Sequence, residues 1–161
     1  MRQSYSRVEA EPFVTWWREQ YEDLPGRLAE ATFWRRGRWN VWVASPDVLP
    51  GDVEPVDGVG IPFLRTGRQV WKPTQIAAIE FGSTAARNVV DLAFDEMITF
   101  LDGGTIRFAP DDARGTEGRR GFVVARHAGV AFGCGLWRQG TLESAVPKGR
   151  QVAFLDSPIG D

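Results

Sequence analysis

The sequence predicts an α+β protein: a small mixed β-barrel with short helices, preceded by an N-terminal helix and a β-hairpin. Two patterns carry this prediction. Residues 121–143 alternate β-prone runs with tight turns, and residues 11–24 place large apolar side chains at helical spacing. The chain has 161 residues, of which 43% are hydrophobic, so it can bury a core of ordinary domain size.

The first expected element is a helix over residues 11–24. Pro12 suits the first turn of a helix, and Pro25-Gly26 ends it. The side chains that fall on one stripe of this helix are Phe13, Trp16, Trp17, Gln20, Tyr21 and Leu24. We expect this aromatic stripe to pack in the core rather than to offer a surface for stacking RNA bases.

A β-hairpin is expected next, with strands at 31–36 and 39–44. A loop rich in Pro, Asp and Gly follows over residues 45–60 and resembles a linker. The expected domain organisation is an N-terminal helix plus hairpin subdomain at 1–45, a main domain at 46–156 and a frayed tail at 157–161.

The middle of the chain alternates short elements. Two short stretches, 59–65 and 68–71, flank a turn. The expected helices are 73–81, opened by Pro73 and closed by Gly82, and 94–101, closed by Gly103-Gly104. The expected strands are 88–92 and 105–108, and residues 109–120 form a polar loop.

The clearest β pattern lies near the C-terminus, with strands at 121–126, 130–137 and 141–143. Gly133 and Gly135 stand inside the second of these strands. A glycine weakens a strand unless a bulge or a close backbone approach requires it, and a strongly bent barrel provides such a context.

Charge is segregated along a chain whose net charge is −2. Two segments are locally basic, and an acidic segment at 88–117 separates them. Their basic residues are Arg65, Arg68, Lys72 and Arg87 in the first, and Arg119, Arg120, Arg126, Arg138, Lys148 and Arg150 in the second. Charge alone favours dispersed surface groups, but the two segments would form one positive face if the fold brings them together.

Catalytic and metal-binding patterns are missing from the sequence. Cys134 is the one cysteine and His127 the one histidine, so neither a disulfide nor a zinc cluster is expected. A nucleophilic pair of Cys134 and His127 is conceivable, but a buried structural cysteine is the better interpretation. We find no phosphate-binding glycine loop and no apolar run of membrane-spanning length. We therefore expect a cytoplasmic protein that is not an enzyme and holds no cofactor or metal.

Several short stretches from about Trp42 onward resemble the C-terminal RNA-binding region of the Sun/Nop-type RNA cytosine-C5 methyltransferases. The likeness is strongest to the PUA-like domain that follows the catalytic domain in the RsmF-like enzymes. The stretches that carry it are 59–68, 71–78, 90–92, 100–103, 121–129, 132–135 and Pro147-Lys148-Gly149-Arg150. The chain departs from the family at Cys134 and Leu136 and at 143–146, which removes positive charge. It also lacks the nucleotide-cofactor fold and the active-site cysteines, so the resemblance implies binding and not methylation.

The resemblance implies a PUA-like barrel that binds structured RNA (rRNA or tRNA) as an accessory factor in RNA modification or ribosome assembly. The residues expected to bind RNA are Arg65, Arg68, Trp71, Lys72, Trp137, Arg138, Lys148, Gly149 and Arg150. The arginines and lysines would contact phosphates, and either tryptophan would stack on an unpaired base unless the core buries it.

Two alternatives stay open. The first is a subunit that docks on an RNA methyltransferase in trans, or on an assembling ribosome, through the aromatic N-terminal helix. The second is an enzyme or small-ligand barrel, which a deep pocket at Cys134 or His127 would favour.

Overall fold

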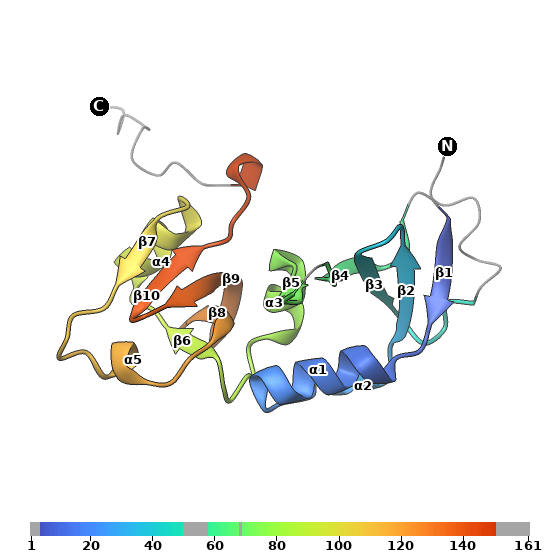
Figure 1. The fold of residues 1–161 in the computed structure, drawn as a ribbon, viewed down its shortest axis with the longest axis horizontal. Coiled ribbons are helices and arrows are strands. Elements are labelled where there is room, and N and C mark those ends of the chain that lie inside the picture. Colours follow the sequence, from blue (N-terminus) through green and yellow to red (C-terminus); the bar gives the residue numbers. More distant parts are fainter. Residues whose placement is uncertain (1–3, 50–57, 68, 151–161) are drawn as a thin grey trace.

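The computed structural model describes residues 4–49, 58–67 and 69–150. Within these residues the chain forms two five-stranded β-sheets with short helices, which confirms the predicted α+β class. One of the sheets curls into a half-barrel. Figure 1 shows the sheets as two lobes, with helix α3 (Gln75–Phe81) between them.

The first sheet is antiparallel throughout and has the strand order β1-β2-β3-β4-β5. Its strands are β1 (Tyr5–Val8), β2 (Thr32–Arg36), β3 (Asn40–Ala44), β4 (Ile61–Arg65) and β5 (Lys72–Pro73). The predicted hairpin is confirmed as β2 and β3. The sequence pattern does not predict β1 or the helix α2 (Gly26–Ala29), because four residues carry too little periodicity.

The second sheet has the order β6-β8-β9-β10-β7, and β6 is parallel to β8 while the other pairs are antiparallel. Its strands are β6 (Val89–Asp91), β7 (Thr105–Arg107), β8 (Gly121–His127), β9 (Val130–Arg138) and β10 (Thr141–Ser144). Its helical segments are α4 (Phe94–Leu101), α5 (Ala113–Thr116) and the 3-10 turn η2 (Lys148–Arg150). The predicted strands and α4 are confirmed, whereas α5 lies inside the predicted polar loop.

Helix α1 (Glu11–Tyr21) is three residues shorter than predicted, because Glu22 adopts a left-handed conformation with φ 48° and ends it. Phe13, Trp17 and Tyr21 are buried in a core that also contains Val124 of β8. The aromatic stripe of α1 is therefore core, as predicted.

Helix α3 begins at Gln75 rather than at Pro73, which lies in β5. Thr74 caps the helix, since its Oγ1 accepts a hydrogen bond of 3.0 Å from the amide of Ala77. The buried Gln75 side chain then joins α3 to the second sheet. Its Oε1 accepts from the amide of Cys134 at 2.9 Å, and its Nε2 donates to the carbonyl of Cys134 at 3.1 Å.

Gly133 of β9 makes room for this contact, since a Cβ there would lie 2.6 Å from Gln75 Oε1. A Cβ at Gly135 would lie 2.5 Å from the backbone carbonyl oxygen of Glu143 in β10 and 2.9 Å from the ring of Phe100. The close approach predicted for these glycines is therefore a side-chain amide at Gly133, and the backbone of the neighbouring strand together with an aromatic ring at Gly135.

The first sheet spans the expected domain boundary at residue 45. Val43 of β3 pairs with Ile61 of β4, on the far side of the 45–60 loop. Tyr21 of α1 also donates a 3.0 Å hydrogen bond to the carbonyl of Phe122 in β8. The hairpin and helix thus share hydrogen bonds with the rest of the chain, while the division into subdomains stays a prediction. The tail at 157–161 lies outside the described residues.

Candidate nucleic-acid interface

A surface groove of about 430 Å³ lies where the two lobes meet. We call it the Trp39 groove. The residues that line it are Trp39, Arg65, Gly67, Val70, Lys72 and Phe122. It combines cationic and aromatic side chains from the first sheet with one aromatic side chain from the second.

Strand pairing places the groove residues together. Arg65 stands opposite Asn40, the neighbour of Trp39, across β3 and β4, and opposite Lys72 across β4 and β5. Thr66 fixes the backbone of Trp39, because its amide and its Oγ1 both donate to the Trp39 carbonyl, at 2.7 and 3.1 Å. The hairpin turn that contains Trp39 is therefore tied by hydrogen bonds to the residue that follows β4.

Two aromatic rings of the groove each form a cation–π contact. The Arg38 guanidinium lies 4.5 Å from the centroid of the Trp39 ring, and Lys72 Nζ lies 5.5 Å from the centroid of the Phe122 ring. Trp39 is 37% exposed. Gly67 packs on the same indole, since a Cβ there would lie 3.6 Å from Trp39 Cγ. A flat ligand could therefore reach the indole where Arg38 now rests.

The groove cations lack acidic partners. Arg38 and Arg65 are exposed and Lys72 is half-buried, and none of the three has a carboxylate within ion-pair distance in the part of the chain that the structure describes. An unpaired cation at a surface keeps its full attraction for a polyanion.

Most arginines of the second basic segment are paired. Arg126 Nε lies 2.7 Å from Asp91 Oδ1, and Arg119 donates to the carbonyl of Val89 at 3.0 Å while pairing with Glu117 at 2.7 Å. These side chains hold the sheet and its loops together. The contribution of this segment to a positive face is therefore smaller than its number of basic residues suggests.

Arg138 has an intermediate position. Arg138 is the last residue of β9 and points to the same face of the sheet as Leu136, two residues earlier. Leu136 pairs with the groove residue Phe122, so Arg138 lies on the face of the second sheet that contributes to the groove. Its Nε is 3.6 Å from Glu143 Oε2, and both side chains are largely exposed. Such an exposed pair is weak and leaves Arg138 available to a stronger anion.

Both predicted tryptophans are packed against other side chains. Trp137 is 8% exposed, and its ring centroid lies 5.4 Å from that of Phe108. Trp71 is half-buried against Phe13 and Trp16, with centroids 5.6 and 6.1 Å away. Packing in the core is the interpretation that the structure favours for both rings.

The predicted Pro147-Lys148-Gly149-Arg150 contact lies elsewhere. Lys148 and Gly149 are exposed in η2, which follows β10, whereas Arg138 precedes β10 at its other end. Figure 1 shows the red η2 turn well apart from the start of β10. Arg68 and the side chain of Arg150 lie outside what the structure describes. The structure thus brings Arg65 and Lys72 together but separates Lys148 from Arg138.

Sequence reasoning does not select Trp39 and Phe122, which supply the aromatic lining of the groove, or Arg38, which lies over the Trp39 ring. The alternating pattern assigns Trp39 to one face of a strand with Val41 and Val43. The strand begins only at Asn40, so the Trp39 ring belongs to the turn. The one available signal is an aromatic residue beside Arg38 in a hairpin turn.

Cys134 and His127 do not form a reactive pair. Burial raises the pKa of the Cys134 thiol to about 12, and its Sγ lies 3.3 Å from Gln75 Nε2. His127 Nδ1 instead lies 2.7 Å from the carbonyl oxygen of Leu92. No group of three or more metal-ligating side chains is found among residues 4–49, 58–67 and 69–150.

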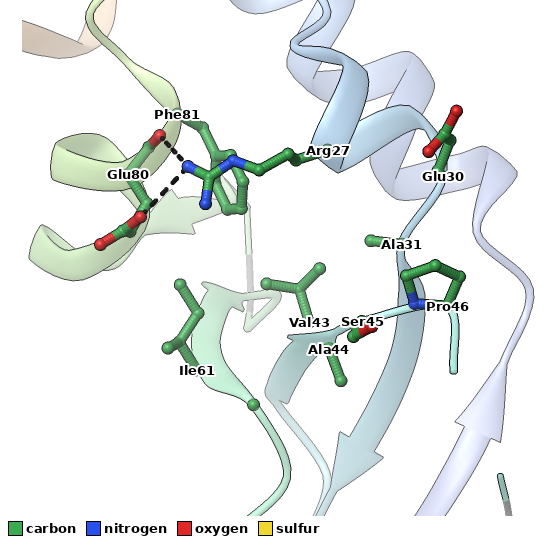
Figure 2. A pocket seen from close by; sticks show the side chains of 11 residues that line it. Arg27, Glu30, Ala31, Val43, Ala44, Ser45, Pro46, Ile61, Glu80 and Phe81 are labelled. Atoms are coloured by element: carbon green, nitrogen blue, oxygen red, sulfur yellow. Dashed lines mark hydrogen bonds and ion pairs between the residues drawn. The ribbon is translucent and has the colours of Figure 1, made fainter. Parts of the chain in front are cut away.

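A second hollow, of about 480 Å³, lies between α2, the end of β3, β4 and α3. Figure 2 shows Arg27 reaching across it to Glu80, where the guanidinium lies 3.2 Å from both the carboxylate and the backbone carbonyl. Its apolar lining residues are Ala31, Val43, Ala44, Pro46, Ile61 and Phe81. This lining suits an apolar group better than a phosphate.

Comparison with protein-family models and with curated proteins found no match to this chain. None of the helices in the described residues is both long and apolar enough to cross a membrane.

Proposed function

We propose that this protein binds RNA through the Trp39 groove, without catalysing a reaction and without a cofactor. The observation that carries the proposal is a set of three cations without acidic partners among the described residues: Arg65 and Lys72 line the groove, and Arg38 lies over the Trp39 ring. Phosphate contacts made by such cations supply most of the affinity of nucleic-acid binders.

The residue resemblance to the Sun/Nop-type methyltransferases directs the proposal to RNA rather than DNA. It also supports a PUA-like type for the half-barrel and a partner role beside an RNA methyltransferase or an assembling ribosome. In this proposal Arg65 and Lys72 bind adjacent phosphates of a structured rRNA or tRNA. Arg138 extends the contact along the second sheet once the phosphate displaces Glu143.

The test is a salt titration of tRNA binding with a charge-matched control. Replacing Arg65 and Lys72 together by Ala should weaken binding and make the slope of log K against log salt less negative by about two, one for each phosphate that the variant no longer neutralises. The control replaces the exposed Arg7 and Arg18, which lie outside the groove and change the net charge equally. If the groove variant binds tRNA as tightly as the control variant does, the proposal is wrong.

A third variant examines the expected η2 contact. Replacing Lys148 and Arg150 by Ala should also flatten the salt dependence if the RNA reaches past β10 to η2. An unchanged slope would confine the interface to the Trp39 groove and its neighbour Arg138.

A further inference from the structure

We infer that the Trp39 groove takes an unpaired nucleotide, whose base stacks on the Trp39 indole in place of the Arg38 guanidinium. This inference rests on the proposed RNA-binding function and names the class of RNA that the site selects. The ligand is an RNA that presents a single-stranded residue, in a loop, a bulge or an end, and not a continuous duplex.

The Trp39 indole is fixed in place, while the side chain that covers it is not. Two hydrogen bonds from Thr66 fix the Trp39 backbone, and Gly67 packs on the ring, so the indole is held in place without a ligand. Arg38, which covers it at 4.5 Å, is itself exposed and has no carboxylate to hold it among the described residues. The indole is fixed, and the guanidinium that covers it is only loosely held. Together they form a site that a flat group can occupy.

A nucleic-acid base binds the face of an indole more strongly than a guanidinium does. A cation–π pair at an exposed position is weaker than the stacking of a base on an aromatic side chain. A base can therefore displace Arg38, and the released guanidinium can then contact the phosphate of the same nucleotide. The exchange keeps the positive charge in the groove and adds the stacking contact.

The groove contains apolar side chains that phosphate binding does not need. Phosphate binding alone needs only the two cations that pair across β4 and β5. The groove also contains the half-buried Phe122 and the 62% exposed side chain of Val70. Apolar walls between cations fit a base flanked by phosphates, which is how proteins hold single strands. In duplex RNA the base faces are stacked on one another and are closed to side chains.

The experiment compares two RNAs of equal length and charge by fluorescence anisotropy: a hairpin with a loop of about seven nucleotides and a fully paired duplex. The parent protein should bind the hairpin about tenfold more tightly, which is the effect of one stacked base. Replacing Trp39 by Ala should weaken hairpin binding about tenfold more than duplex binding and so remove this preference, whereas Trp39→Phe should retain most of it. Loop RNAs with single abasic sites should show one position where the parent loses the preference and the Ala variant loses nothing further.

The outcomes separate the inference from the function on which it rests. If Arg65→Ala with Lys72→Ala weakens both RNAs but Trp39→Ala leaves the hairpin preference intact, phosphate binding stands and base stacking is wrong. If Trp39→Ala weakens both RNAs equally, the indole does not read an unpaired base and the inference fails. If the double cation variant binds both RNAs like the parent, the proposed function itself fails. Thermal melts of each variant establish that it is folded.

Discussion

Replacing Gln75 by Ala tests the contact that joins the two lobes. The Gln75 amide makes two hydrogen bonds with the backbone of Cys134, through Oε1 at 2.9 Å and Nε2 at 3.1 Å. Both residues are buried, so water cannot replace the missing amide without entering the core. The truncation also leaves a void beside Gly133, where the absence of a Cβ makes room for the amide.

The magnitude follows from these two effects. A buried backbone donor left without its acceptor costs about 1–3 kcal/mol, and the removed side chain adds a cavity cost. The sum is about 3 kcal/mol in the free energy of unfolding. For a chain of this size each kcal/mol lowers the Tm by about 2–4 °C, so the Tm should fall by about 6–12 °C.

The assay is urea unfolding followed by tryptophan fluorescence, with a thermal melt as a second measurement. Ile79→Ala is the matched control, because it truncates an apolar side chain of the same helix that is 44% exposed. It should cost less than about 1 kcal/mol. The reasoning is refuted if Gln75→Ala costs no more than this control, since the amide would then contribute nothing beyond helix packing.

Two further predictions follow from ionisable groups. Because burial raises the pKa of the Cys134 thiol to about 12, a thiol reagent at about pH 8 should label the folded protein no faster than it unfolds, and rapid labelling without denaturant would contradict the burial. The hydrogen bond from Arg126 holds the pKa of Asp91 below its ordinary value, so this pair stabilises the fold above the ordinary value and loses that effect as the pH falls through the lowered pKa. Asp91→Asn should therefore lower the free energy of unfolding by at most about 1 kcal/mol at about pH 7, because solvent screens the exposed carboxylate, and should lower it by less at about pH 2. Urea titrations at both pH values measure this. The same difference at both would show that the charge is not responsible.

Local signals in the sequence account for the elements that are predicted well. Helix α4 has the predicted bounds, because acidic residues at its start and glycines after its end mark both termini. Local signals do not predict which distant strands pair with each other. Nothing in the local pattern of Ile61 indicates that it pairs with Val43 across the 45–60 loop, so the sequence predicts a hairpin that precedes a barrel, where the structure has two five-stranded sheets.

The candidate site also contains residues that the sequence predicts and residues that it does not. Charge and turn pattern are enough to select Arg65 and Lys72, which the structure places opposite each other. They are not enough to sort the tryptophans. Trp137 is enclosed by contacts that come from Phe108 and from the 109–120 loop, and Trp39 is left exposed by the place where β3 begins. Exposure of an aromatic residue depends on such tertiary contacts, which a single sequence does not record.

The electrostatic character of the surface depends on which cations are paired and not on how many there are. The acidic segment 88–117 neutralises much of the basic segment after it, as the 2.7 Å contact between Arg126 and Asp91 illustrates. The Trp39 groove receives no such partner from the described residues, although the whole chain carries a net charge of −2. A groove with apolar walls concentrates the field of the cations that line it, so a slightly acidic molecule can still attract a polyanion at one place. Salt should therefore weaken the proposed RNA binding at the groove far more than a net charge of −2 would suggest.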